Sequence, residues 1–394
     1  LPRSAAAGAA RPPVMSPAVA FVPRRVPPYP GALFARPHGE MRQRGISLEV
    51  MVAGPEARPA ALSPTAPPWQ STIGARRLAA AGREVIWQNV VRATAAHDLV
   101  ITELSPRIIS NLALLVRSRR GGPRVGGFGH GRNFASARIP GPRSAHGRLV
   151  RSLDWWFAYN DLSREALLAL GVAAARITPV NNTIDTKLLA DAVASHRGAD
   201  PVQLRRSLGI EGAPVAVFCG SLYARKRLEF IFDSVLRLRH DFPDLNLLVV
   251  GDGPCGAQVR AFADAHEWVH YVGRVVGAQR AKYLAASDVM LMPGLVGLVV
   301  LDSFAAQVPL ITTDWPFHSP EIQYLRHGEN GWRAENTLEA YVAAVALVLG
   351  DHELRARLRR GCEEATALYP MQGMVTRFAE GIVAALGPGG RRSA

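Results

Sequence analysis

Short apolar runs alternate with longer amphipathic stretches along most of the chain. Runs of this length suit buried strands, whereas apolar residues recurring every three or four positions suit helices. In the first half this pattern predicts strands at 18–22, 48–53, 84–87, 98–104, within 123–133, and at 155–159 and 177–180. It predicts helices between them at 32–44, 105–118 and 163–170. Ser105 is expected to cap the helix at 105–118.

The same alternation is clearer in the second half. Strands are predicted at 215–219, 245–250, 269–272, 289–292 and 310–313, and helices at 228–240, 257–266, 278–286 and from about Leu298 onward. Strands that alternate with helices form a parallel sheet covered on both faces. A chain of 394 residues exceeds the usual single core, so two domains are expected. The predicted fold is therefore α/β, with two Rossmann-like domains and a ligand cleft between them.

Composition places the domain boundaries. Residues 1–17 are rich in Ala, Pro and Arg and are expected to be a disordered leader; the Pro-rich connection 54–68 is expected to be an exposed loop. We predict an N-terminal domain at 18–186, a polar helical linker at 187–213 and a C-terminal domain at 214–371. Residues 372–394 are predicted to form a helix that packs back towards the N-terminal domain, followed by a tail.

The net positive charge belongs to the first half of the chain. Residues 1–185 carry 24 Arg, no Lys and ten acidic residues, whereas residues 186–394 carry 22 basic and 22 acidic residues. The net charge of +14 therefore belongs to the N-terminal half. Such an asymmetry suggests an anionic partner, which is either a membrane surface or a phosphorylated acceptor, unless the arginines reflect codon bias. Aromatic residues are few and no nucleic-acid motif occurs, which argues against nucleic acid.

Cysteine content and hydropathy restrict the protein's class further. Cys219, Cys255 and Cys362 are too few and too scattered for a disulfide framework or a zinc site. No run of 18 apolar residues is present, so no spanning helix is predicted. The simplest expectation is a cytoplasmic protein, with peripheral attachment at the inner membrane face as the option that its charge suggests.

The stretch 293–314, PGLVGLVVLDSFAAQVPLITTD, carries the clearest candidate chemistry. A strand leads through Gly294 and Gly297 into a helix, and the first-turn N–H groups of such a helix attract anions. Asp302 lies one turn inside the helix, where its carboxylate can accept hydrogen bonds from a ribose. The alternative is an ordinary βαβ crossover in which the glycines only make the turn.

Several further segments, taken in order with this stretch, carry a family resemblance. They read GSLYARKR (220–227), VVGDGP (249–254) and YVGR (271–274) in the second half, and FGHGRN (128–133), DWWFAYND (154–161) and NNTID (181–185) in the first. As a set they resemble the two-domain GT-B glycosyltransferases of family 4, in particular a bacterial subgroup. The resemblance covers residues 18–386 and is strongest in the second half. It implies an acceptor-binding N-terminal domain and a C-terminal domain that binds a nucleotide-sugar donor.

The resemblance assigns the donor's nucleotide to specific positions. Lys226, assisted by Arg225, matches the basic residue at the diphosphate, and a cation there offsets charge on the departing group. Asp302 matches the acid that binds ribose. The remaining implied nucleotide-sugar contacts are Gly220, Ser221, Gly273, Arg274, Gly297, Leu298 and Val299, with Gly273 and Arg274 at the nucleobase. Ser221 replaces an arginine that is frequent in the family. The alternatives are a solvated basic helix start at Lys226 and a simple strand-end turn at Gly273.

The sugar-binding positions depart from the family pattern. The first acid of its Glu-x7-Glu motif is here Gly294, so a sugar contact there is in doubt. His318 or Glu321 is then the candidate contact, although a helix-capping role is the alternative for both. His130, between two glycines, matches a position that faces the donor sugar; with Lys226 it is our predicted catalytic pair. The alternative for His130 is a role in orienting its own loop.

These assignments imply a retaining transferase that moves a sugar from a nucleotide diphosphate to an acceptor hydroxyl in bacterial polysaccharide or glycoconjugate synthesis. The acceptor is expected to be a glycan, a lipid-linked molecule or a small molecule. No Asp-x-Asp motif occurs, so neither a metal nor a cofactor is expected. Two alternatives remain: a GT-B protein that binds a nucleotide without transfer, and a nucleotide-sugar 2-epimerase. The donor sugar, the base and the oligomeric state do not follow from the residues.

Overall fold

The computed structural model describes residues 16–23, 30–53, 67–80, 83–105, 107–198 and 200–387. Most of the predicted leader (1–17), nearly all of the Pro-rich connection (54–68) and the tail after residue 387 lie outside the described residues. Contacts divide the chain into two compact units. The first contains residues 1–30, 34–126 and 382–394, and the second contains residues 31–33 and 127–381. The predicted domain boundaries stay a prediction.

A seven-stranded sheet contains all but two of the strands before residue 180. Its order is β3-β2-β1-β6-β7-β8-β9, and the pairs β1–β2, β2–β3, β1–β6 and β8–β9 are parallel. The strands are β1 (Ala18–Val22), β2 (Ser47–Ala53), β3 (Gln70–Ile73), β6 (Leu99–Glu103), β7 (Arg124–Gly129), β8 (Trp155–Ala158) and β9 (Ile177–Pro179). The continuous apolar runs of β1, β6 and β8 are buried, as expected for central parallel strands.

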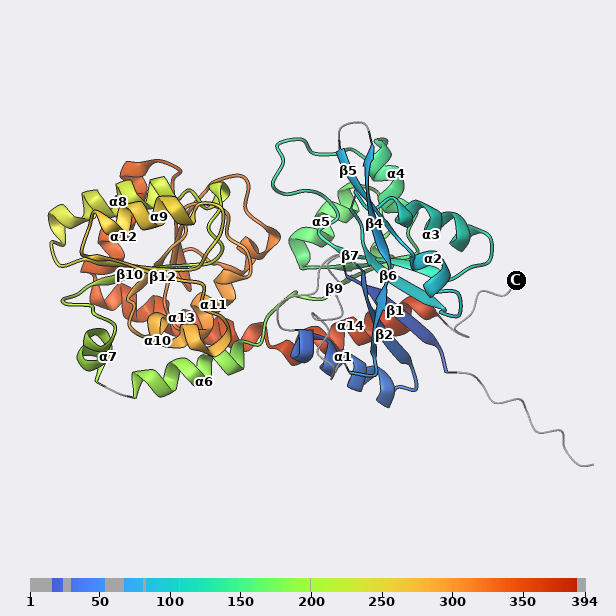
Figure 1. Cartoon of the computed structure of the whole chain (residues 1–394), viewed down its shortest axis with the longest axis horizontal. Helices are drawn as coiled ribbons and strands as arrows, with labels where there is room; N and C mark the ends of the chain where they lie inside the picture. The colour runs from blue at the N-terminus through green and yellow to red at the C-terminus, as the bar shows by residue number, and fades with distance from the viewer. Residues whose placement is uncertain are drawn as a thin grey trace, which may run out of the picture. The chain divides into compact units, whose positions relative to one another are not determined.

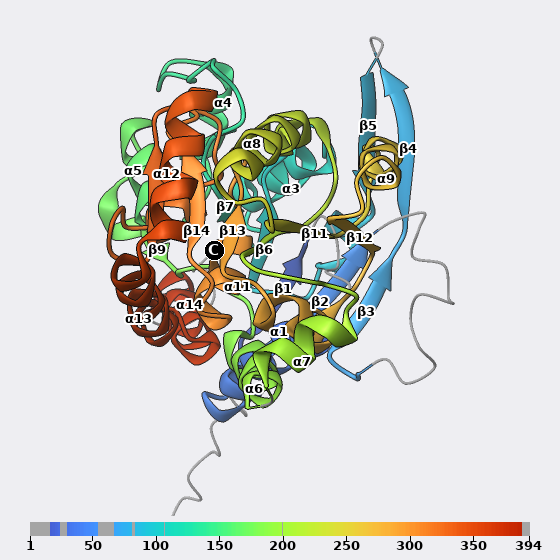
Figure 2. The same ribbon diagram turned by 90° about the vertical axis from the view of Figure 1, so that its left-hand side faces the viewer.

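One local prediction in this region is confirmed in part and one is wrong. The strand predicted at 84–87 is present, but it does not belong to the seven-stranded sheet, whose edge strand at this end is β3. It lies in β5 (Arg83–Gln88), which pairs antiparallel with β4 (Ala75–Ala80) in a separate hairpin (Figure 2). Ser105 does not cap the next helix, since α3 (Ser110–Arg119) begins five residues later and its N-cap, Ile109, has no side-chain acceptor. Ser105 Oγ instead accepts from the backbone N–H of Arg107 at 3.4 Å.

Helices occupy the connections between these strands. They are α1 (Pro30–Gln43), α2 (Val90–Ala93), α3, α4 (Ala145–Arg151) and α5 (Asp161–Ala169). Asn160 caps α5 by accepting from the N–H of Ser163, and Ser144 caps α4 in the same way. Trp156 is fully buried. Among the described residues, no helix has both the length and the apolar character needed to cross a membrane.

A second, six-stranded sheet has the order β12-β11-β10-β13-β14-β15, and all five neighbouring pairs are parallel. Its strands are β10 (Val215–Cys219), β11 (Asn246–Val250), β12 (Val269–Gly273), β13 (Val289–Leu291), β14 (Leu310–Thr313) and β15 (Gly331–Ala334). In Figure 1, α8 (Leu228–Asp241) and α9 (Gly256–Asp264) lie above this sheet, and α10 (Ala281–Ala285) and α11 (Val299–Ala305) lie below it. Two parallel sheets whose strands are connected by helices confirm the predicted α/β fold class.

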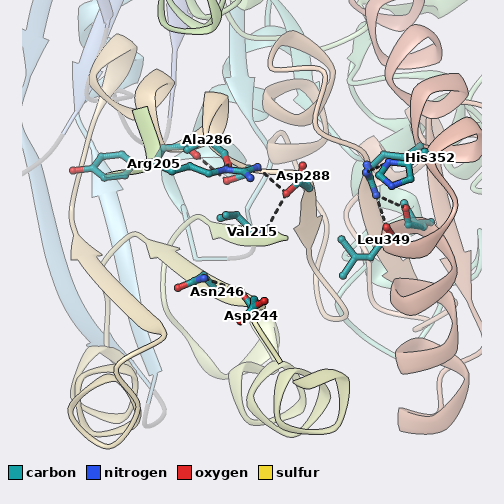
Figure 3. Close-up of polar contacts among 12 residues, drawn as sticks. Arg205, Val215, Asp244, Asn246, Ala286, Asp288, Leu349 and His352 are labelled. Carbon is teal, nitrogen blue, oxygen red and sulfur yellow. Dashed lines mark hydrogen bonds and ion pairs between the residues drawn. The ribbon is translucent and has the colours of Figure 1, made fainter. Parts of the chain in front are cut away.

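A partly buried ion pair lies at the start of the six-stranded sheet (Figure 3). Asp288, just before β13, accepts from Nη2 of Arg205 and from the backbone N–H of Val215, both at 2.8 Å. Nε of Arg205 also donates to the carbonyl of Ala286 at 2.9 Å. Arg205 belongs to α7 (Pro201–Ser207). The pair therefore connects the predicted linker segment to the N-terminal ends of β10 and β13.

The predicted linker is helical, and part of it belongs to a core. It forms α6 (Thr186–Arg197) and α7, and Asp185 caps α6 by accepting from the N–H of Leu188. Leu189 and Val193 of α6 join the core cluster of the six-stranded sheet. After β15 come α12 (Leu338–Gly350), α13 (His352–Leu368) and α14 (Met371–Leu386). Phe378 of α14 packs against Phe157 of β8, with ring centroids 5.0 Å apart.

Candidate active site

A pocket of about 340 Å³ lies at the carboxyl ends of six strands. Its twelve lining residues all belong to the unit that contains residues 127–381. They follow β7, β8 and β9 of one sheet, and β10, β13 and β14 of the other. They are His130, Tyr159, Asn182, Ser221, Tyr223, Lys226, Leu295, Gly297, Leu298, Val299, Ser319 and Glu321. Ligands of open α/β sheets bind at this edge, because loops from many strands converge there.

Lys226 brings a buried positive charge to the pocket. It ends a short 3₁₀ helix (Ala224–Lys226) after β10, and its side chain is 6% exposed. Its Nζ donates to the carbonyl of Leu295 at 2.6 Å and lies 3.6 Å from Sδ of Met292. An ammonium group has three N–H donors, so one remains for a ligand. Burial lowers the pKa of Lys226 to about 8. These contacts contradict the alternative of a solvated helix start.

Glu321 supplies a buried carboxylate. It lies in the 3₁₀ helix Pro320–Tyr324 after β14 and is 3% exposed. Asn182 Nδ2 donates to its Oε1 at 3.3 Å. The carbonyl of Pro320 accepts from Asn160, and the carbonyl of Asn182 accepts from the hydroxyl of Tyr324. Burial raises the pKa of Glu321, and hydrogen bonds from its own backbone and from Asn182 oppose that rise. The loops after β8 and β9 therefore position this carboxylate.

His130 presents a polar atom without a partner. Among the described residues, its Nδ1 is buried and has no hydrogen bond. Its ring packs edge-on against Tyr159, with centroids 4.2 Å apart, and burial lowers its pKa to about 4. The imidazole is therefore neutral at pH 7. Gly131, beside it, has a φ of +74°, and a Cβ there would lie 2.7 Å from Leu167. Packing against α5 thus explains that glycine.

Gly294 has a structural reason to lack a side chain. A Cβ at this position would lie 2.3 Å from the carbonyl oxygen of Arg225 and 2.7 Å from the carbonyl carbon of Lys226. The N–H of Leu295 donates to the same Arg225 oxygen at 2.9 Å, which holds the two loops together. An acid at residue 294 would have to displace the turn that carries Lys226. Gly294 does not line the pocket.

Asp302 is buried in an ion pair and does not line the pocket. Nη1 of Arg280 donates to its Oδ2 at 2.7 Å, and Nη2 of Arg280 lies 2.7 Å from its Oδ1 without the geometry of a hydrogen bond. Its side chain is nearly inaccessible, and burial raises its pKa to about 6, against the opposing effect of the guanidinium. A ribose can bond to Asp302 only if this pair rearranges. Its nucleotide role stays a prediction.

The other predicted contacts lie outside the pocket lining. They are Gly220, Arg225, Gly273, Arg274 and His318. Both ring nitrogens of His318 are occupied: Nδ1 accepts from the N–H of Val296 at 3.1 Å, and Nε2 lies 2.9 Å from the carbonyl of Thr313. His318 therefore braces its loop through backbone groups that lie outside the helices, so these contacts do not bear out the helix-capping alternative for His318.

The sequence did not point to five lining residues: Tyr159, Asn182, Tyr223, Leu295 and Ser319. Tyr159 and Asn182 lie within the motifs DWWFAYND and NNTID, two of the segments that carry the family resemblance. Their place at the ends of β8 and β9 was the available signal. Leu295 contributes a backbone carbonyl, and a backbone contact leaves no trace in side-chain type.

Comparisons with known proteins bear on the family and the fold. Residues 213–351 match the family described as Glycosyl transferases group 1. Among solved structures, a glycosyltransferase from Rickettsia africae superimposes with a TM-score of 0.69 over 95% of this chain and 99% of that one, at 11% identity. HepE from Anabaena, in complex with UDP and glucose, gives 0.68 over 93% and 99%, at 14% identity. The chain has the GT-B fold of glycosyltransferases.

The curated relatives of this GT-B chain are mannosyltransferases. A GDP-mannose-dependent α-(1-6)-phosphatidylinositol dimannoside mannosyltransferase from Mycobacterium tuberculosis is 26% identical over 227 residues, which are 57% of this chain and 55% of that protein. A related monomannoside mannosyltransferase from Mycolicibacterium smegmatis is 25% identical over 218 residues, 51% of this chain and 55% of that protein. The chain thus spans about half the length of these relatives.

Proposed function

We propose that this GT-B protein transfers a sugar from a nucleotide diphosphate donor to an acceptor hydroxyl, with retention of the anomeric configuration. The observation that carries the proposal is the convergence of Lys226, Glu321 and His130 on one pocket beside the turn 297–299. A cation, a carboxylate and a neutral imidazole provide separate partners for a diphosphate and for sugar hydroxyls.

Lys226 would act on the leaving group. In the transfer, the bond between the anomeric carbon and the donor phosphate oxygen breaks, and negative charge grows on the diphosphate. The ammonium of Lys226 is held in place by Leu295 before the reaction, so it stabilises this charge without reorganising. The new bond forms between the anomeric carbon and the acceptor oxygen, and the acceptor proton passes to the departing phosphate oxygen. A displacement on one face of the sugar retains its configuration.

Glu321 and His130 would hold the sugar. The carboxylate of Glu321 accepts hydrogen bonds from sugar hydroxyls, which places it in the role that Gly294 cannot fill. The imidazole of His130, which lines the same pocket, makes a second bond to a hydroxyl. Because burial keeps this imidazole neutral, it adds no positive charge beside an oxocarbenium-like centre.

The relatives suggest which substrates to test first. The two mycobacterial proteins are named as GDP-mannose-dependent and act on phosphatidylinositol mannosides. Solved neighbours contain UDP or UDP-glucose. We therefore propose GDP-mannose as the first donor, UDP-glucose as the comparison, and a lipid-linked acceptor.

A membrane-bound acceptor also suits one exposed face in the basic half. Leu112 and Val116 of α3 are 55% and 47% exposed, and Arg119, also exposed, follows at helical spacing on the same face. An apolar stripe that ends in arginine fits the surface of an anionic bilayer. Not every arginine of this half is available, because Arg117 and Arg151 donate to backbone carbonyls.

The test is a thermal-shift screen of nucleotide diphosphates and their sugars, followed by an assay of donor turnover. We expect one nucleotide to stabilise the chain and its sugar conjugate to be hydrolysed slowly without acceptor. Binding without any turnover, for every donor tried, would favour a nucleotide-binding protein that has lost transfer. The absence of a side chain at residue 294 is the observation behind that second candidate.

A further inference from the structure

A loop leaves the pocket at the end of β7 and runs to the start of α4. It spans residues 130–144 and belongs entirely to the unit that contains the pocket lining. It begins with His130, which lines the pocket, and Figure 2 shows the loop beside α4. At its middle, the side chain of Ile139 is 69% exposed, more than any other large hydrophobic residue that the structure describes. Lone apolar residues are common on protein surfaces, so the surroundings of Ile139 decide whether its exposure has a use.

Hydrogen bonds hold both ends of this loop. At its start, Nε2 of His146 lies 2.8 Å from the carbonyl oxygen of Gly131. At its end, the hydroxyl of Ser144 donates to the carbonyl of Gly141 at 2.6 Å. Because α4 and its capping residue brace the loop at both ends, the loop keeps Ile139 at the surface.

The loop and α4 carry positive charge and no negative charge. Residues 127–153 contain five arginines and no acidic residue. Arg138, Arg143 and Arg148 are exposed. Ile139 therefore lies between exposed guanidinium groups on both sides along the chain. An apolar residue among cations matches an anionic bilayer, whose phosphates lie at the edge of its hydrocarbon region.

The base of the loop connects this surface to the pocket. The guanidinium carbon of Arg132 lies 4.1 Å from the ring centroid of Phe134. The Phe134 ring in turn packs edge-on against the ring of His130, with centroids 6.1 Å apart. Arg132 is partly exposed, so an aromatic contact holds a cation close to a residue that lines the pocket. A lipid that meets the loop therefore meets the same short segment that supplies His130.

We propose that residues 137–143 dock the chain on an anionic membrane surface. Ile139 inserts below the lipid phosphates, and Arg138 and Arg143 bind those phosphates. The inference rests on the proposed function and names the source of its acceptor: a lipid-linked molecule that approaches His130 from the bilayer. One apolar side chain with a few cations gives weak attachment, so the docking is reversible.

Sedimentation with vesicles tests this docking. The full chain is mixed with vesicles of phosphatidylcholine alone, or of phosphatidylcholine and phosphatidylglycerol in equal amounts. We expect the wild type to bind the mixed vesicles at low salt, and the neutral vesicles at least about tenfold less tightly. Ile139→Ser should weaken binding to mixed vesicles about tenfold, by a factor that does not depend on salt, because the side chain loses its burial in hydrocarbon. Arg138→Gln with Arg143→Gln should also weaken it about tenfold at low salt, and by less as salt rises.

Matched controls carry the same changes at other exposed positions of the same unit. They are Leu188→Ser on α6, and Arg357→Gln with Arg360→Gln on α13. Both should bind vesicles as the wild type does. Every variant is also titrated calorimetrically with the nucleoside diphosphate, and we expect wild-type affinity, because none of the changed residues lines the pocket.

Vesicle binding that neither loop change weakens would overturn the docking assignment and leave the α3 face as the contact. Binding of a single-stranded oligonucleotide that depends on Arg138 and Arg143, without binding to mixed vesicles, would overturn it in favour of nucleic acid. The proposed function fails separately: a wild type that docks on vesicles as expected but binds no nucleotide would lose the donor site and keep the membrane surface.

Discussion

Removing the charge of Lys226 should lower donor turnover. It should also abolish the rise in stability that the wild type is expected to show as the pH increases. The ammonium is 6% exposed and its pKa falls from 10.5 to about 8, because burial disfavours the charged form. This displacement corresponds to a cost of roughly 3 kcal/mol for holding the charge in the folded chain at neutral pH. Lys226→Met relieves that cost but leaves the carbonyl of Leu295 without its donor, a loss of about 1–3 kcal/mol.

The two effects nearly cancel at pH 7, so the diagnostic quantity is the change with pH. Below pH 8 both the folded and the unfolded chain hold the proton on Lys226. Between about pH 8 and 10.5 only the unfolded chain holds it, so the stability of the wild type rises with pH across this window. Lys226→Met has no such proton and should lack this rise. The wild type should therefore gain up to roughly 3 kcal/mol relative to the variant over the window.

Urea unfolding of both proteins at several pH values from 7 to about 10.5 measures this difference, since every other titrating group is common to the pair. In parallel, donor turnover by Lys226→Met should fall by on the order of 100-fold at pH 7. The wild-type kcat/KM should decline above about pH 8, where the amine becomes neutral. Parallel stability curves, or near wild-type turnover in a folded variant, would refute the argument that Lys226 is a buried charge kept for the diphosphate.

Three further outcomes are expected. Gly294→Ala should destabilise the chain by about 1–3 kcal/mol, because its Cβ overlaps the backbone of the adjacent turn; thermal unfolding would contradict this if the midpoint did not move. Asp302→Ala should weaken binding of the nucleoside diphosphate by about 1–3 kcal/mol in calorimetry, and unchanged affinity would restrict Asp302 to its ion pair with Arg280. Arg119→Glu should reduce co-sedimentation with anionic vesicles at low salt and leave donor binding intact, since each basic residue near the surface contributes about 1 kcal/mol. Equal sedimentation with neutral vesicles would favour a soluble acceptor.

The fold was largely predictable because buried parallel strands carry continuous apolar runs. β10 and β11 lie within one residue of their predicted bounds for that reason. β3, with the sequence QSTI, has a mixed pattern and only one buried residue among its four, so no apolar run marked it. The hairpin β4–β5 was missed because ARRLAA resembles a helical or loop segment until its partner is known. The pairing of β4 with β5 depends on tertiary contacts that the local sequence does not reveal.

For the site, the family resemblance was needed to select Lys226 and His130, whereas the turn 297–299 was marked by the residues themselves, because it links a strand end to a helix start. The sequence could not decide between candidates whose roles depend on neighbours far along the chain. Burial and the bond from Asn182 place Glu321 in the pocket, whereas two backbone partners engage His318 three residues earlier. Asp302 forms an ion pair with Arg280, and the close approach of the Arg225 carbonyl excludes a side chain at Gly294. The type of a residue determines which groups its side chain can bond to. Only the folded chain determines whether that side chain is already bonded to another residue.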